Sequence, residues 1–271
     1  RKYVLKNLFA AEAFSIKPKQ WCYPVIGCAG YRGYFNEQQL ERFSTELKKQ
    51  GYEVYIANVP AYSTLDWFDD PVLNTFVFWP DYSLAGLIFH ELSHQYVYVD
   101  GDSQFNESFA VAVQQSGVEA WLTSLGEVDK LSKYREHINN RRQVIELIIE
   151  TRGELKHIYA TTMKLPEKKL AKQRAIKGLK SRYQKLSHGF DVQDGFARWF
   201  DGDINNARLA SISTYYAYVS AFKNLLKNNN SFNSFLQQVK KVSKLPRDQR
   251  NSCMEYWLQE SQNGSKTVEH S

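Results

Sequence analysis

The feature that most constrains this chain is His90-Glu91-Leu92-Ser93-His94, an H-E-x-x-H pattern. The chain has only six histidines in 271 residues, so composition alone would produce the pattern about 0.01 times in such a chain. On a helix, residues four apart lie on one face, so both imidazoles can reach a single ion. The pattern therefore predicts a metal-binding helix, with two histidines as ligands and Glu91 beside the ion as a general base.

The surroundings of the two histidines favour this interpretation. The apolar run LAGLIF precedes them, which predicts a partly buried helix. Buried polar groups without partners are costly, and a bound zinc ion removes that cost. The alternative is that His90 and His94 are ordinary core or surface histidines. We favour Zn2+ as the cofactor.

A catalytic zinc ion needs a third protein ligand and an open position. The next histidine, His137, lies in a different and basic part of the chain, so an acidic residue is the better candidate. Glu107 lies on the next predicted helix, and the twelve residues that separate it from His94 allow the chain to reverse direction. Its neighbour Asn106 is suited to hydrogen bonds that orient the ligands. Glu107 could instead be a solvated helix residue, and the rival ligands are Asp100, Asp102 and Glu119.

The order of apolar patterns predicts an α+β fold with a small, mixed N-terminal sheet. Residues 1–20 indicate a short helix or arm, and alternating residues predict strands within 21–35, 52–64 and 72–79. An amphipathic pattern predicts a helix over 36–51, and the chain beyond residue 80 is mostly helical in pattern.

The length suits one large domain, and we expect residues 1–271 to form it. Its parts are the sheet with the metal-site helices (1–125), a basic helical hairpin (126–190), a C-terminal helical region (191–260) and a disordered tail (261–271).

The positive charge of the chain belongs to the hairpin. Residues 130–188 contain 16 Lys+Arg against 5 Glu, a net of +11, while the other residues have a net of −5. The alternative function is therefore a non-proteolytic basic module that binds anionic lipid, cell-wall polymer or nucleic acid. Its candidate contacts are Lys168, Lys169, Lys172, Arg174, Lys177, Lys180 and Arg182. Such a charged hairpin is more often a solvated face, and its few aromatics argue against base stacking, so we expect no specific nucleic acid.

Several blocks of the sequence resemble the predicted-aminopeptidase family of Gram-negative bacteria. They are WCYPVIGCAGYRGYF, VPAYSTLDWFDDPVLNTF, LAGLIFHELSHQ, DSQFNESFAVAVQQSGVEAWL and NNARLASISTYY. The resemblance covers about residues 18 to 226 and implies a zincin-like metallopeptidase of gluzincin type. His90, His94 and Glu107 would then be zinc ligands and Glu91 the general base for peptide hydrolysis.

The implied reaction also needs a donor that stabilises the oxyanion. Arg208, Tyr215 and Tyr218 share one face of a predicted helix, and Tyr216 is adjacent. We keep Tyr215 and Arg208 as catalytic candidates, although this helix could simply pack on the domain.

The peptide substrate is less constrained than the metal site. An aminopeptidase needs carboxylates for the substrate α-amine, and Asp66, Asp69 and Asp70 are candidates, although acids in turns are common. The G-x-M-E-N motif of the best-known zinc aminopeptidases is absent, so a zinc endopeptidase and a zinc scaffold without peptidase activity stay open. The strand expected at 72–79 would bind the substrate main chain if it is an edge strand.

The resemblance also implies export to the periplasm, often as an outer-membrane lipoprotein. The chain begins with Arg1 rather than Met, so we expect that a signal peptide or lipid anchor has been removed, with peripheral membrane association. Cys22 and Cys28 permit a disulfide in an oxidising compartment or are two buried thiols, and the resemblance favours the disulfide.

Overall fold

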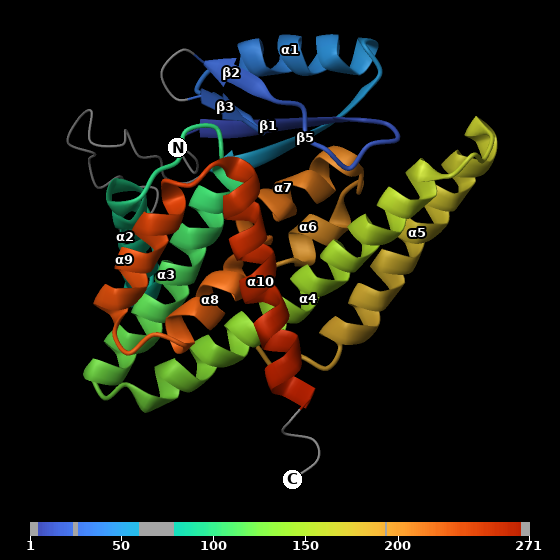
Figure 1. Cartoon of the computed structure of the whole chain (residues 1–271). Coiled ribbons are helices and arrows are strands. Elements are labelled where there is room, and N and C mark those ends of the chain that lie inside the picture. The colour runs from blue at the N-terminus through green and yellow to red at the C-terminus, as the bar shows by residue number, and fades with distance from the viewer. Residues whose placement is uncertain (1–4, 24–26, 60–78, 193, 267–271) are drawn as a thin grey trace. The chain divides into compact units, whose positions relative to one another are not determined.

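The computed structural model describes residues 5–23, 27–59, 79–192 and 194–266 (Figure 1). The chain divides into two compact units, which we describe separately. The first unit contains residues 1–21, 29–62 and 121–213, and the second contains residues 22–28, 63–120 and 214–271. The expected single domain over 1–271 stays a prediction.

The first unit contains a three-stranded antiparallel sheet in which β1 (Leu5–Glu12) lies between β4 (Arg32–Tyr34) and β5 (Tyr52–Val59). Leu8 lies opposite Arg32 on one side and Ile56 on the other. The fold is α+β as predicted, and among the described strands of this sheet β1 is antiparallel to both neighbours, so its expected mixed character stays a prediction.

The strand β1 falls where we expected a short helix or arm, so that prediction is wrong. The four residues from Leu8 to Ala11 are all buried. A central strand covered on both faces is a continuous apolar run rather than an alternation, and such a run does not distinguish a strand from a helix.

The helix predicted over 36–51 is present as α1 (Glu37–Lys49). Asn36 caps its start, with its side-chain oxygen accepting from the Gln39 backbone nitrogen at 3.0 Å. Gly51 follows the end of the helix with a φ of 88°, a left-handed conformation that glycine adopts without strain.

The predicted helical hairpin is present in the first unit as α4 (Val128–Ala160) and α5 (Leu165–Ser187). Val144 and Ile148 of α4 and Leu179 of α5 are fully buried. The short helix α6 (Ala197–Asp201) and most of α7 (Asn206–Tyr216) complete the unit.

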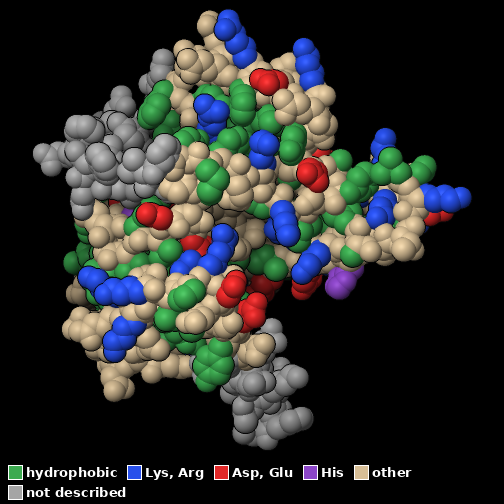
Figure 2. Space-filling view, turned by 45° about the horizontal axis from the view of Figure 1, so that its top comes forward, with side chains coloured by type: hydrophobic (Ala, Val, Ile, Leu, Met, Phe, Trp, Pro, Cys, Tyr) green, Lys and Arg blue, Asp and Glu red, His purple; other side chains and the backbone are tan. Residues whose placement is uncertain are grey.

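The charge of the hairpin is only partly available to solvent. Lys168, Lys172, Lys180 and Arg182 donate to other groups of the first unit. On the face shown in Figure 2, blue Lys and Arg side chains stand beside green hydrophobic ones where α4 and α5 connect, at the right of the view. The hairpin is thus a packed element as well as a charged one.

The second unit is mostly helical, and its helices surround an apolar cluster. Phe105, Phe109, Phe222, Phe235 and Met254 are fully buried in that cluster. Its helices are α2 (Asp81–Tyr96), α3 (Ser103–Ser124, which continues into the first unit), α8 (Val219–Lys227), α9 (Phe232–Ser243) and α10 (Arg247–Lys266). The expected C-terminal helical region is therefore present. Because α10 extends to residue 266, the start of the predicted tail at 261 is helical, and residues 267–271 lie outside the described part.

Two short strands, β2 (Trp21–Tyr23) and β3 (Gly27–Ala29), form a separate two-stranded sheet. A disulfide joins Cys22 to Cys28, as the family resemblance implied. The strand expected at 72–79 and the acids Asp66, Asp69 and Asp70 fall outside the described residues. Among the described helices, none has the length and apolar character needed to cross a bilayer.

Candidate metal centre

Two glycines let helices α2 and α3 of the second unit pack closely. A Cβ atom on Gly117 of α3 would lie 2.8 Å from the Phe89 ring of α2, closer than real Cβ contacts. A Cβ on Gly86 of α2 would lie 3.3 Å from the side chains of Gln114 and Val118 on α3. Small residues at both positions therefore allow side chains of the two helices to meet.

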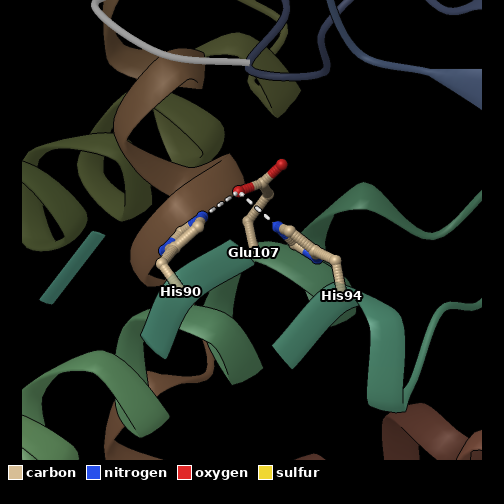
Figure 3. Close-up of side chains that lie close together, drawn as sticks. All are labelled: His90, His94 and Glu107. Carbon is tan, nitrogen blue, oxygen red and sulfur yellow. Dashed lines mark ion pairs between the residues drawn. The ribbon is translucent and has the colours of Figure 1, made fainter. Parts of the chain in front are cut away.

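Three predicted ligands converge between these helices (Figure 3). His90 and His94 extend from α2, and Glu107 extends from the second turn of α3. The Nε2 atoms of His90 and His94 lie 3.3 and 3.8 Å from Oε2 of Glu107. His94 and Glu107 are buried and His90 is nearly so, which places the group largely out of contact with solvent.

The two imidazoles have different electrostatic surroundings. Burial lowers the pKa of His90, but the hydrogen bond and the charge of Glu107 outweigh it, so the pKa lies above its ordinary value. Burial lowers the pKa of His94 below its ordinary value, and Glu107 offsets this only in part. In the absence of a metal, His90 therefore takes up a proton more readily than His94 does, and the protonated ring pairs with the carboxylate of Glu107.

Gln114 orients the ring of His90. Its Oε1 atom lies 3.2 Å from Nδ1 of His90, so a proton on Nδ1 can be donated to the amide oxygen. When a metal is bound, that arrangement leaves the lone pair of Nε2 for the metal, and such partners of metal-binding histidines are common. Sequence reasoning missed Gln114. The signal that would have found it is its position two helical turns after Glu107, on the same face.

The residues present fit a divalent metal. One ligand atom from each of the three side chains lies within 4.8 Å of the others. Ligands of a tetrahedral zinc ion with bonds of about 2.0–2.1 Å are roughly 3.3 Å apart, which is close to the observed Nε2–Oε2 separations. Two imidazoles and one carboxylate are also a known donor set for catalytic zinc. Among the described residues, the second ring nitrogen of His94, Nδ1, is buried without a hydrogen-bond partner, while its Nε2 is directed at Glu107.

The turn before α3 explains why Glu107 rather than its rivals reaches the histidines. Asn106 Oδ1 accepts from the Val99 backbone nitrogen, and Asn106 Nδ2 donates to the Val99 carbonyl, both at 2.9 Å. These bonds fix the turn, as expected for a residue that orients a ligand. Asp102 caps α3 instead of joining the histidines, since Phe105 N donates to its Oδ1 at 3.2 Å. Of the other rivals, Asp100 is exposed, and Glu119 lies 3.9 Å from Lys223.

Two further residues lie beside the group. Glu91 is half-buried on α2, and its charge contributes to the raised pKa of His90. The ring of Tyr98 meets the His94 ring edge-on, with centroids 6.4 Å apart. Burial, followed by the charges of Glu107 and Asp100, raises the pKa of Tyr98, so its phenol keeps its proton and can donate. Sequence reasoning missed Tyr98 because α2 ends before it and helical spacing does not place it.

The predicted oxyanion donors are placed differently. Arg208 belongs to the first unit, where Nη1 donates to the Asp203 carbonyl at 2.8 Å and the guanidinium lies over the Tyr55 ring. Tyr215 is half-buried near the end of α7, in the second unit. The structure brings together His90, His94 and Glu107, and catalytic roles for Arg208 and Tyr215 stay predictions.

Comparison with known proteins identifies the family. The family model described as "Putative aminopeptidase" matches residues 1–254. That span includes the three converging side chains, Glu91, all of the first unit and the second unit as far as residue 254. The chain therefore belongs to this family, which supports the resemblance seen in the sequence. The comparison with curated proteins and the comparison with solved structures each give no match.

Proposed function

We propose that this protein is a zinc-dependent peptidase of gluzincin type, acting as an aminopeptidase. The observation that carries the proposal is the convergence of His90, His94 and Glu107, with Glu91 adjacent to His90 on the same helix. The family description supports peptidase chemistry, and the donor set supports zinc over Mg2+ or Ca2+, which prefer oxygen ligands alone.

His90, His94 and Glu107 would hold the metal. When bound, zinc supplies Lewis-acid chemistry by lowering the pKa of a coordinated water and polarising the scissile carbonyl. Glu91 accepts the proton of the attacking water and returns it to the leaving amine. Gln114 keeps the His90 ring oriented throughout, because its amide oxygen accepts from Nδ1.

Tyr98 joins Tyr215 and Arg208 as a candidate donor to the developing oxyanion. Its ring contacts His94 and it is 41% exposed, so it reaches both the metal group and solvent. A phenol with a raised pKa stays protonated at neutral pH and can donate a hydrogen bond to the oxyanion. Arg208 is the weakest of the three, since its guanidinium already donates to the Asp203 and Arg198 carbonyls.

The substitution Glu91→Gln tests the proposal. It should leave about one zinc ion per chain and lower the hydrolysis of amino-acid arylamides by at least about 100-fold, the lower range for loss of a general base. Glu119→Gln is the matched control, because Glu119 lies on α3 near Lys223 and should be dispensable. Glu91→Gln with undiminished hydrolysis would refute the role of Glu91. Zinc binding with no hydrolysis of any peptide by the wild type would favour a scaffold.

A second experiment, which compares a peptide with its N-acetylated form, tests whether the protein is an aminopeptidase or an endopeptidase. An aminopeptidase cleaves a peptide with a free α-amine and spares the same peptide after N-acetylation, whereas an endopeptidase cleaves both. The basic-module alternative stays a prediction, and it is the weaker one because four of its seven candidate side chains already donate within the first unit. We therefore carry only the peptidase forward.

The disulfide supports the further proposal that the protein functions in an exported, oxidising compartment such as the periplasm. Structural disulfides persist in such compartments and are rare in the cytosol. The bond between Cys22 and Cys28 lies in the second unit, the unit that carries the metal group. Fractionation of cells that make the natural protein, with a periplasmic and a cytosolic marker, tests this placement.

A further inference from the structure

A buried ion pair lies at the start of the helix that carries Glu107. Arg250 of α10 donates to a single oxygen of Asp102 through both Nε and Nη2, at 2.9 and 2.7 Å. Both side chains are almost fully buried. Nη1 of Arg250 donates in addition to the Leu245 carbonyl at 2.7 Å, so the guanidinium is held from two sides.

The other carboxylate oxygen of Asp102 caps the start of α3. Oδ1 accepts from Phe105 N, and the Asp102 carbonyl accepts from Asn106 N at 3.1 Å, the bonding of an N-cap residue. The guanidinium of Arg250 also lies over the Phe105 ring, 5.5 Å from its centroid. Glu107 follows directly after these capped residues. Any movement of Asp102 would therefore move the first turns of α3 and Glu107 with them.

The chemistry of the pair exceeds what capping requires. A neutral serine or asparagine caps a helix as well as an aspartate does. Burial of a carboxylate and a guanidinium costs several kcal/mol in desolvation, and apolar side chains are often as stable in such places. What the ion pair adds is position, because two charge-assisted N–H bonds locate Oδ2 while the Phe105 N–H holds Oδ1, so the carboxylate is fixed from both sides.

The helix α10, which carries Arg250, is packed against its neighbours. Met254, one helical turn after Arg250, is fully buried in the apolar cluster of the second unit together with Phe222. Trp257 of α10 accepts through its carbonyl from Asn224 of α8 at 2.8 Å. Arg250 is thus presented by a helix that is packed and tied to its neighbour.

We infer that Arg250 and Asp102 are positioning residues that clamp the start of α3 and thereby set the place of Glu107 as the third metal ligand. The inference rests on the proposed function, since it assigns the pair a role toward the metal. Neither residue is one of the three candidate ligands. The C-terminal helix thus contributes to metal affinity from outside the H-E-x-x-H helix and the ligand-bearing helix.

The test measures metal affinity and stability separately in the full chain. Zn2+ and Co2+ affinities are measured by competition titration at a temperature where each variant is folded, and the visible absorption of bound Co2+ reports the ligand arrangement. Arg250→Met should weaken binding by about 10-fold, the effect typical of lost support around a metal site, and alter the Co2+ spectrum. Arg250→Lys keeps the charge without the two-nitrogen contact and should fall in between.

Two further variants separate positioning from stability. The double variant Asp102→Asn, Arg250→Met removes the unpaired charge and should regain melting temperature without regaining affinity. Val239→Ala creates a cavity in the same apolar cluster, where Val239 is fully buried, and should lose melting temperature while keeping wild-type affinity. The double variant also serves if Arg250→Met alone does not fold.

The outcomes are distinct. Wild-type affinity and Co2+ spectrum in folded Arg250→Met, or in the double variant, would overturn the clamp while leaving the peptidase proposal intact. Loss of affinity in Val239→Ala equal to that in Arg250→Met would also overturn it, because affinity would then follow stability alone. A wild-type chain that binds neither metal would remove the proposed function, and the clamp's role toward the metal with it.

Discussion

Each unit of this protein contains a cluster of buried and half-buried polar side chains, and the two clusters differ in the chemical groups that they bring together. In the first unit, Lys172 pairs with Glu53, and Asn206 N donates to the other oxygen of Glu53 at 2.7 Å. In the second unit, His90, His94 and Glu107 direct two imidazole nitrogens and one carboxylate oxygen at a common point. Donors that meet acceptors stabilise a fold, whereas lone pairs that meet one another are suited to a cation.

The largest effect should come from breaking the cluster of the first unit. Lys172→Met leaves the carboxylate of Glu53 without its cation, and loss of one partner of such a pair costs about 3–5 kcal/mol of unfolding free energy. Chemical denaturation measures this, and metal affinity in the folded variant should be unchanged. Lys177→Met is the control, because Lys177 is exposed on the same helix. Equal stability of the two variants would show that the first cluster is not structural.

Glu107→Ala should lower metal affinity, which Lys172→Met leaves unchanged. Loss of a ligand weakens zinc binding by at least about 100-fold, beyond the usual effect of losing an outer partner. Zinc at 100 times its dissociation constant stabilises the wild type by about 2.7 kcal/mol, so a chelator should lower the wild-type melting temperature and leave that of the variant unchanged. One tightly held zinc ion in Glu107→Ala would show that the third ligand is a different residue.

A smaller effect should follow from Gln114→Ala. The variant removes the acceptor of the His90 Nδ1 proton and should weaken zinc binding by about 10-fold. Gln115→Ala is a matched control on the next residue of α3, where the side chain accepts from Lys223 instead. Competition titrations of both variants make the comparison, and equal affinities would remove Gln114 from the support of the site.

The three candidate metal-binding side chains could be predicted from the sequence because they lie close together along the chain. Helical spacing places His90 and His94 on one face, and a short reversal brings Glu107 back toward them. Gln114 and Arg250 were not found, since their roles depend on how α2 and α10 pack against α3. No spacing rule links residues 148 positions apart, as Asp102 and Arg250 are.

The fold shows the same division between local and long-range information. The amphipathic helix α1 and the hairpin of α4 and α5 follow from periodicity and agree with the structure. The strand β1 does not, because a strand buried on both faces lacks the alternation that marks a half-exposed one. Its antiparallel pairing with β4 and β5 depends on contacts distant in sequence, which no local pattern specifies.

The central claim is that the second unit holds a zinc ion on His90, His94 and Glu107. Plasma mass spectrometry of protein purified without a metal-chelating resin tests it most directly. We predict about one zinc ion per chain, and a large loss of zinc in Glu107→Ala but not in Lys172→Met. A wild-type protein that is free of metal, and that takes up no zinc on titration, would contradict it.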